Sequence, residues 1–407
     1  MSRGRRRANG EGSIYPVPGG YRGYVWVTNP DGTRRRKYVK ATTYEETLAK
    51  WRDLHARARH GPVPSRTPRL SEFLEYWLGE VVRPDLAPLT VSTYETFVRL
   101  YIGPYLGKRR LDQVRVRDVR AWLNRLRVLC QCCVQGKDAR RPEGKRRCCA
   151  IGKCCNDVAS ERTVRDARAI LRSALAYAMT EELVTKNAAA LVRMQPTRKR
   201  RLQPWTVEEV RAFLESARTE HDPMYAAYVL ILVLGLRKGE VLGLTWTDIN
   251  FDANEVAITH QLQRVGRQLL YRETKTESSE AILPLPDLCV TALKERRADQ
   301  FTDAEPFGEV WPGDDFVFTT KFGTPIDPRN FNRSFAAGCA RASVRPIRVH
   351  DARHTCATLL AALDVHPRVA MRIMRHSQIA ITMDVYTHVP SEETRDALKR
   401  LGDSLRQ

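Results

Sequence analysis

The pattern of apolar and polar residues near the start of the chain is that of a small sheet followed by a helix. Residues 21–28 alternate aromatic residues with valines, which is the period of two of a β-strand. An Asp-Gly pair then indicates a hairpin turn, and residues 34–40 read as a second, strongly basic strand. Thr43 and Glu46 have the spacing of a capping box at a helix start. We therefore predict a sheet-and-helix domain within residues 1–60.

The next part of the chain carries the periodicity of helices. Apolar residues recur three and four positions apart in four segments, residues 70–81, 90–107, 116–126 and 159–183. A linker rich in proline and glycine precedes these segments, and a run of basic residues follows them. We predict a helical domain over residues 69–195, with residues 127–157 inserted between its third and fourth helices.

The second half of the chain mixes both patterns. Apolar strands at residues 256–259 and 281–285 stand among amphipathic helices, and Gly235 ends an apolar helix just before Arg237. We predict a mixed α/β domain over residues 202–390. The fold class is therefore multidomain, mainly α with α+β.

Composition narrows the choice of partner. Against 47 acidic residues the chain has 68 Lys and Arg, which gives a net charge of +21 and indicates a polyanion. No apolar run approaches the ~20 residues of a membrane span, and no apolar stretch follows the basic start as it would in a signal peptide. Ten cysteines without a secretory signal indicate reduced thiols. We expect a nucleic-acid partner, no membrane, and a cytoplasmic location at the bacterial nucleoid.

Most of the cysteines lie in the insertion. They are Cys130, Cys132, Cys133, Cys148, Cys149, Cys154 and Cys155, and they stand among Lys137, Arg140, Arg141, Lys145, Arg146 and Arg147. Thiolates in a reducing compartment favour zinc, and four of the seven would complete one tetrahedral site. The spacing is not a paired C-x-x-C, however. Two interpretations stay open, one structural zinc ion and a reactive or merely tolerated loop without metal.

A set of cationic and protonatable residues precedes one tyrosine near the end of the chain. It consists of Arg237, Lys275, His350, Arg353, His376 and Tyr386. His350 and Arg353 are three residues apart and so share one face of a helix. A phenol has a pKa of about 10, so Tyr386 needs a proton acceptor and a polarised phosphate before it can attack. The other groups can neutralise a phosphodiester and protonate its leaving oxygen without a metal ion or ATP.

Short motifs surround these residues. Residues 235–244 read GLRKGEVLGL, residues 275–279 read KTESS, residues 350–355 read HDARHT, and residues 376–388 read HSQIAITMDVYTH. In this order and at this spacing the chain resembles the tyrosine recombinase (phage integrase) family, and the resemblance extends over about residues 10 to 390.

The resemblance implies a role for each residue. Tyr386 attacks the scissile phosphate and forms a 3′-phosphotyrosyl enzyme with a free 5′-hydroxyl. Arg237 and Arg353 hold the non-bridging oxygens, and His376 donates to one of them. His350 assists proton transfer at Tyr386, and Lys275 protonates the leaving oxygen. Supporting roles fall to Glu240 and Asp248, which orient the arginine motif, and to His354. The resemblance implies no cofactor for catalysis.

The resemblance also implies how DNA is held. The domain of residues 1–60 resembles an arm-site DNA-binding domain and the helical domain a core-binding domain, so both contact double-stranded attachment sites. Contacts are expected from Arg34, Arg35, Arg36, Lys37, Arg198, Lys199, Arg200 and Arg201. For the strand and linker the alternative is a solvated basic surface. A homotetramer on synapsed DNA, a host DNA-bending protein and an excisionase complete the expected partners.

The function implied is a site-specific recombinase that integrates or excises a phage genome or mobile element. A resolvase, an enzyme like topoisomerase IB and a non-catalytic DNA-binding regulator on the same fold are the alternatives. A tail helix over residues 391–407 carries an apolar stripe, which packs on a neighbouring subunit or on its own domain. The chain departs from the family pattern in two places. Glu280 and Ala281 replace basic residues, and Arg375 stands where relatives have a glycine suited to a left-handed helix end.

Overall fold

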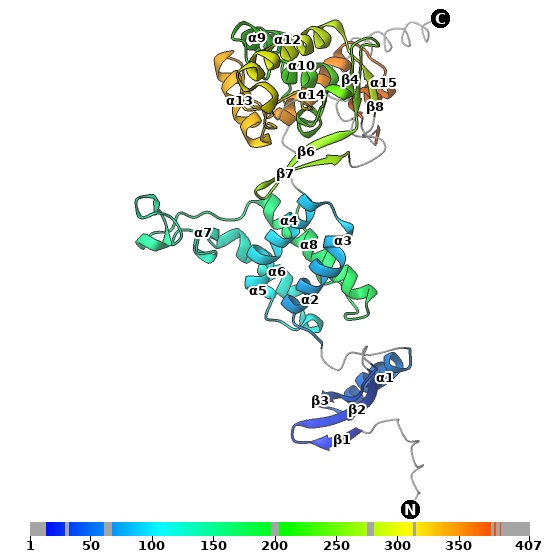
Figure 1. The fold of residues 1–407 in the computed structure, drawn as a ribbon. Coiled ribbons are helices and arrows are strands. Elements are labelled where there is room, and N and C mark those ends of the chain that lie inside the picture. The colour runs from blue at the N-terminus through cyan, green and yellow to red at the C-terminus, as the bar shows by residue number, and fades with distance from the viewer. Residues whose placement is uncertain are drawn as a thin grey trace, which may run out of the picture. The chain divides into compact units, whose positions relative to one another are not determined.

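The chain forms two compact units, Met1–Pro196 and Thr197–Gln407 (Figure 1). The computed structural model describes residues 14–28, 32–60, 67–196, 203–274, 281–311 and 315–375, together with Gln378, Ile379 and Met383. Among these residues no helix is both long enough and apolar enough to cross a membrane.

The amino-terminal part is an antiparallel sheet covered by one helix. Its strands are β1 (Ile14–Val17), β2 (Gly20–Thr28) and β3 (Arg34–Ala41), and α1 (Tyr44–His60) packs on β2 and β3. The valines of β2 face the helix and are buried, as their alternation predicts. The backbone N–H of Glu46 donates to the Thr43 hydroxyl (3.2 Å), so the predicted helix start is confirmed.

The rest of this unit is helical, and the four predicted helices are present. They are α2 (Leu70–Trp77), α4 (Pro88–Phe97) with α5 (Gly103–Leu106), α6 (Val116–Val128) and α8 (Glu161–Thr180). The first two run on through π-helical turns, Leu78–Val82 and Val98–Ile102, which the apolar pattern did not reveal, and α3 (Arg83–Asp85) follows the first of these. The helices enclose one core, in which the Trp122 indole donates to the Tyr101 carbonyl (2.7 Å).

The insertion leaves the helical core between α6 and α8 and runs out as an arm (Figure 1). It contains α7 (Gln131–Val134) and two 3₁₀ turns, Glu143–Lys145 and Cys149–Ile151. Backbone hydrogen bonds close its root, because Ala159 N–H donates to the Leu126 carbonyl (3.2 Å) and Gln131 N–H to the Asp157 carbonyl (2.7 Å).

The second unit is built around α10 (Tyr225–Leu234), a helix that is apolar on nearly every side. Because such a helix needs cover all round, α9 (Val207–Thr219), α12 (Asp287–Ala304) and α14 (Val349–Ala362) pack against it. An aromatic cluster of Trp205, Phe213, Tyr228, Phe331 and Phe335 joins α9 and α10 to α13 (Pro328–Arg341). The last described helix is α15 (Pro367–Met374).

Two small sheets accompany these helices. One is antiparallel, with the order β4 (Ile249–Asn250), β5 (Glu255–Ile258) and β8 (Ala281–Pro284), and its last two strands are the predicted ones. The other is a two-stranded ribbon of β6 (His260–Val265) and β7 (Gln268–Glu273). The sequence prediction did not include this ribbon, which lies between β5 and β8 in the chain.

A short helix, α11 (Lys238–Leu242), lies against β6. The approach is close enough to require glycine, since a Cβ on Gly243 would lie 2.9 Å from the Cα of Gln261. This contact fixes the start of the ribbon relative to the segment that carries Arg237.

Candidate active site

Arg237 is positioned by the two elements on either side of it. Gly235 adopts a left-handed conformation (φ +61°) and ends α10, and Arg237 stands immediately before α11. Glu240, on the first turn of α11, accepts the Arg237 backbone N–H (2.7 Å) and its Nη1 (2.6 Å). Glu240 therefore fixes both the backbone and the guanidinium of Arg237, and the Arg237 side chain remains about 39% exposed.

Arg353 projects from α14 into the same region and is buried. Its two terminal nitrogens donate to the carbonyls of Gly235 and Met374, which are the ends of α10 and α15. These bonds use two of the five N–H groups of a guanidinium and fix its plane. Burial, and then the positive charge of Arg237, lower the pKa of Arg353 to about 9, so the group stays charged at neutral pH.

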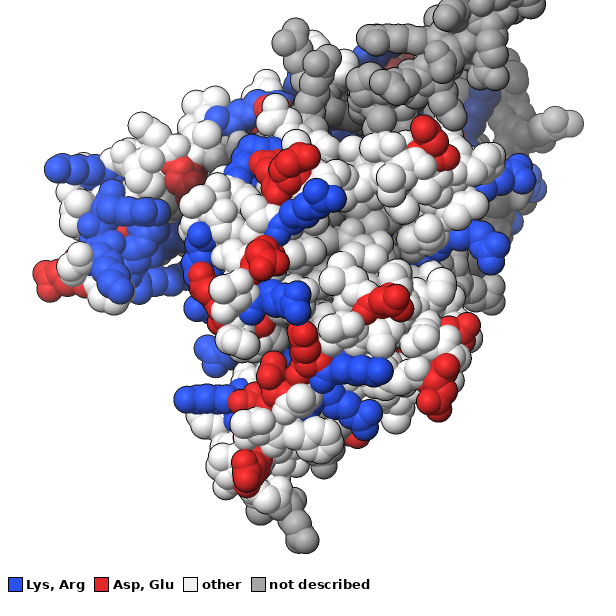
Figure 2. All heavy atoms as spheres, turned by 90° about the horizontal axis from the view of Figure 1, so that it is seen from above, with Lys and Arg blue, Asp and Glu red and all other residues white. Residues whose placement is uncertain are grey.

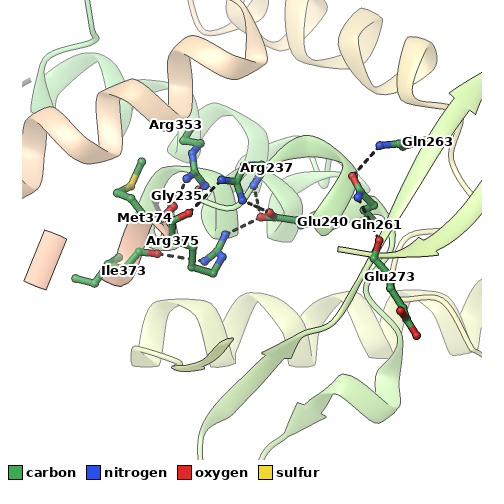
Figure 3. A network of polar contacts seen from close by, with 10 residues as sticks. All are labelled: Gly235, Arg237, Glu240, Gln261, Gln263, Glu273, Arg353, Ile373, Met374 and Arg375. Carbon is green, nitrogen blue, oxygen red and sulfur yellow. Dashed lines mark hydrogen bonds and ion pairs between the residues drawn. The ribbon is translucent and has the colours of Figure 1, made fainter. Parts of the chain in front are cut away.

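A third guanidinium, that of Arg375, completes the group (Figure 3). Arg375 follows α15 in the left-handed conformation (φ +49°, ψ +49°) that the sequence predicts for this position. Its Nη2 donates to Glu240 (2.6 Å), and its carbonyl accepts from Arg237 (3.1 Å). The side chain that replaces the expected glycine therefore becomes part of the site.

Glu240 is ionised at the centre of this group. Burial alone would raise the pKa of its carboxyl, but the charges of Arg375 and Arg237 outweigh burial and lower it. Arg237 and Arg375 pair with this carboxylate, and the nearby Arg353 adds a third positive charge, which leaves an excess of positive charge. Such a site stabilises an added anion such as a phosphate.

His350 and His354 lie one turn apart on α14. Their rings meet edge to face with centroids 4.9 Å apart. Burial, and then repulsion by His354 and Arg353, lower the pKa of His350 below its ordinary value. Burial also lowers the pKa of His354. At neutral pH His350 is uncharged and can accept a proton.

Arg237, His350 and Arg353 line one cavity of about 540 Å³. Two further cations line it, Lys238 and Arg348. Lys238 donates to the side chain of Asn332 (3.1 Å), and Arg348 is paired with Asp351 (2.7 Å). Sequence reasoning missed both residues, although each is close to a motif that it singled out.

Three of the predicted catalytic residues, Lys275, His376 and Tyr386, lie outside the described residues. The chain on either side of them is described in part. Lys275 comes two residues after the end of β7, and His376 directly follows Arg375. The basic linker residues Arg198, Lys199, Arg200 and Arg201 and the tail of residues 391–407 also lie outside the described part.

Asp248 bonds to two threonines near the small sheet of β4, β5 and β8. Its carboxylate accepts from the Thr245 backbone (2.9 Å), the Thr245 hydroxyl (2.7 Å) and the Thr259 hydroxyl (3.3 Å). Asp248 therefore fixes the turn before β4 and its joint with β5. Arg237 is oriented by its hydrogen bonds with Glu240.

The basic strand β3 divides its charges between two faces. Arg34 and Arg36 lie on the outer face with Tyr38, whereas Arg35 and Lys37 pair with the valines of β2 on the face that carries α1. The four basic residues of this strand therefore lie on two faces of the sheet.

The outer face of this sheet combines cations with aromatic rings. Arg36 stacks over Tyr24 (4.8 Å) and Trp26 (4.9 Å), and Arg22 stacks over Tyr38 (4.0 Å). Stacking holds the guanidinium groups flat against the sheet, where they can meet a phosphate backbone. Arg22 was not singled out in the sequence analysis. The alternation of residues along β2 and β3 could have placed it on the outer face of the sheet.

The cysteines of the insertion come together although their sequence spacing is irregular. They form two groups, in each of which the sulfurs lie within 4.8 Å of one another. One group is Cys130, Cys133, Cys148 and Cys154, and the other is Cys132, Cys148 and Cys155. Cys149 is exposed and belongs to neither group.

Two family models match the chain. One, for the phage integrase family, matches residues 203–393, and the other, for the N-terminal SAM-like domain of phage integrases, matches residues 69–127. The first spans the arginine and histidine motifs, and the second spans the helical part before the insertion.

Curated relatives align over most of the chain. A tyrosine recombinase XerC-like protein of Caldanaerobacter subterraneus is 26% identical and covers 92% of this chain and 93% of its own length. An integrase of Saccharopolyspora erythraea is 23% identical over 98% of this chain and 97% of its own length. The transposase of transposon Tn916 from Enterococcus faecalis is 27% identical over 80% of this chain and 76% of its own length.

Solved structures share the fold. The Tn1549 transposon integrase, in complex with a circular intermediate DNA, superposes with a TM-score of 0.64 at 21% identity and covers 82% of this chain and 99% of its own. A lambda integrase dimer bound to a core site gives a TM-score of 0.52 at 15% identity over 94% of this chain and 96% of its own. From its family domains and from relatives along nearly its whole length, the chain belongs to the phage integrase family, the tyrosine recombinases.

Proposed function

We propose that this protein is a site-specific recombinase of a mobile element that cuts and rejoins DNA through a 3′-phosphotyrosyl intermediate. The observation that carries the proposal is the convergence of Arg237 with His350 and Arg353 of α14 on one cavity beside the carboxylate of Glu240. A neutral histidine beside preorganised arginines suits attack by a weakly acidic nucleophile on a phosphodiester.

Tyr386 is the nucleophile in this proposal. Its phenolic oxygen forms a bond to phosphorus while the bond from phosphorus to the 5′-oxygen breaks. The phenolic proton passes to His350, whose lowered pKa keeps it uncharged and able to accept the proton. One phosphate ester replaces another, so the step is reversible and needs no ATP.

Charge on the phosphate is neutralised by the arginines. Arg237 and Arg353 donate to the non-bridging oxygens, and the excess positive charge around Glu240 stabilises the pentacoordinate transition state. His376, one residue after Arg375, donates to one of the same oxygens. Loss of one such preorganised donor typically raises the barrier by about 3–4 kcal/mol.

Lys275 protonates the leaving 5′-oxygen. It follows β7 closely, and the ribbon of β6 and β7 is tied to α11 through the close contact at Gly243. The ribbon that precedes Lys275 in the chain is thus held against the helix that begins beside Arg237. Glu280 and Ala281, just beyond, supply no basic contact.

Double-stranded attachment sites are the substrate. We propose that residues 1–60 bind accessory sites, residues 69–195 and 202–390 bind the crossover site, and the linker of Arg198 to Arg201 contacts phosphate. Since each chain carries one Tyr386 and recombination cuts four strands, four protomers assemble on two duplexes. The tail of residues 391–407 packs on the neighbouring subunit in that assembly, and a host DNA-bending protein and an excisionase act with it.

A relaxing enzyme like topoisomerase IB is the enzymatic alternative, and a DNA-binding regulator without activity is the other. The family relatives favour neither. Relaxation by monomers without sequence preference would identify the first, and failure to trap a covalent adduct would identify the second.

The first prediction concerns Tyr386. Tyr386→Phe is expected to bind an attachment site as the wild type does and to form no covalent adduct on a nicked suicide substrate, because the phenyl ring has no nucleophile. Tyr271→Phe, which removes a hydroxyl from the ribbon, is the matched control and should still form the adduct. Adduct formation by Tyr386→Phe at the wild-type rate, measured on denaturing gels, would refute the assignment.

The second prediction concerns pH. Since the pKa of His350 lies below its ordinary value of about 6.5, the cleavage rate should hold at neutral pH and fall as the pH drops below about 6.5 and His350 gains a proton. His350→Gln should cut the rate roughly 10²–10⁴-fold and abolish this acid limb. His354→Gln should move the limb to higher pH, because His354 helps to lower the His350 pKa. An acid limb that persists in His350→Gln would contradict the role.

The third prediction separates backbone strain from charge at Arg375. Arg375→Gly relieves a strain of about 1–2 kcal/mol but removes one partner of a buried ion pair, worth about 3–5 kcal/mol. The free energy of unfolding should fall by about 2 kcal/mol in urea titrations. Ser343→Gly is the matched control, since the exposed Ser343 has a similar conformation (φ +53°), and its stability should rise or stay level. Equal stability of the two variants would exclude the ion pair as a stabilising contact.

The fourth prediction concerns the outer face of the amino-terminal sheet. The logarithm of the accessory-site binding constant falls linearly with the logarithm of the salt concentration. Arg36→Gln should make this slope less steep by about 0.9 for each phosphate contact that the substitution removes. Arg35→Gln removes the same charge from the other face of β3 and should change the slope less. Fluorescence anisotropy across a salt series measures both slopes. Equal slopes for the two variants would show that this face does not contact DNA.

A further inference from the structure

The sulfurs of the insertion are spaced as metal ligands are. Sulfur-to-sulfur distances are 3.4 Å for Cys133 and Cys148, 3.9 Å for Cys130 and Cys148, 3.8 Å for Cys130 and Cys155, and 4.0 Å for Cys133 and Cys154. Four thiolates at about 2.3 Å from a tetrahedral zinc ion lie roughly 3.8 Å apart. A disulfide needs its sulfurs at about 2 Å, and all these cysteines are free.

One zinc ion would leave this arrangement incomplete. A single site of Cys130, Cys133, Cys148 and Cys154 leaves Cys132, which is fully buried, and Cys155 packed beside its thiolates. Cys148 belongs to both sulfur groups and also accepts the backbone N–H of Cys155 (3.3 Å). Cys130 likewise reaches Cys155 as well as Cys148.

The loop is held in this shape by one buried carboxylate. Asp138 accepts the backbone N–H groups of Arg147 (2.9 Å), Cys148 (2.8 Å) and Ala150 (3.1 Å), so it fixes the segment that carries Cys148. Arg141 pairs with Asp138 (2.7 Å) and reaches the sulfur of Cys132 (3.7 Å). The site is therefore ordered around the position where the two sulfur groups meet.

The surroundings match the charge of a metal–thiolate cluster. Two divalent ions with six thiolates carry two net negative charges. The insertion carries seven cations, Lys137, Arg140, Arg141, Lys145, Arg146, Arg147 and Lys153. Figure 2 shows Lys and Arg side chains gathered on a projecting lobe at the left of that view. Nearby cations favour the thiolate over the thiol, which is the form that binds metal.

We propose that the insertion binds two zinc ions in one cluster of six cysteines. Cys130 and Cys148 bridge both ions, Cys133 and Cys154 complete the first tetrahedron, and Cys132 and Cys155 complete the second. The six thiols release their protons on binding, and no oxidation occurs. The arrangement differs from both interpretations that the sequence left open, one zinc ion and no metal, and it leaves out Cys149.

Metal content tests the proposal independently of recombination. Full-length protein produced with zinc and purified without chelator should contain two zinc ions per chain by plasma mass spectrometry and by native mass spectrometry. Cys149→Ser is the matched control and should retain two. Cys132→Ser should retain one, because the first tetrahedron is still complete, and Cys148→Ser should fall below one.

The bridges are tested by loading the wild-type protein with cadmium-113. Two resonances of thiolate-bound metal that are coupled to each other through the shared sulfurs are expected. Wild-type protein with no zinc, or with one zinc ion that Cys132→Ser does not change, would overturn the proposal. Two uncoupled cadmium resonances would overturn the bridging roles of Cys130 and Cys148.

Discussion

The buried carboxylate of Glu240 is the interaction on which the catalytic unit depends. It bonds to the backbone and side chain of Arg237 at the start of α11 and to the side chain of Arg375 at the end of α15. Arg353 joins the ends of α10 and α15 through their carbonyls. Helix ends that are remote in sequence are thus fastened together by charge. The arginines are held before any phosphate arrives, so little reorganisation remains for the transition state.

Arg375 shows that a residue unsuited to its backbone conformation can still be favourable. A left-handed conformation costs a side chain about 1–2 kcal/mol relative to glycine. Here the side chain turns inward and gives Glu240 a second cationic partner, so the burial of that carboxylate is compensated. Without a cationic partner, the buried carboxylate would lower the free energy of unfolding by roughly 3–5 kcal/mol. The stabilisation from the ion pair therefore exceeds the cost of the left-handed backbone at Arg375.

Much of the fold and part of the site could be predicted from the sequence. Strand alternation and helical periodicity located β2, β3 and the four helices of the first unit because those elements each bury one face. The ribbon of β6 and β7 was missed, since polar residues such as Gln261 and Gln263 interrupt its apolar positions. The contacts of Asp248 with Thr245 and Thr259 could not be predicted, because they depend on the turn geometry. The cysteine groups were hidden for the same reason, as the loop brings together residues with no regular spacing.

The closed root of the insertion has a consequence for how such chains can vary. Since Leu126 and Ala159 are hydrogen-bonded, the chain leaves and re-enters the helical core at a single point, and α6 and α8 would still meet there if the intervening residues were fewer or more. The entropic cost of a loop grows only slowly with its length. The junction between α6 and α8 is thus a site at which insertions of different length or sequence can replace one another without changes in the two helices.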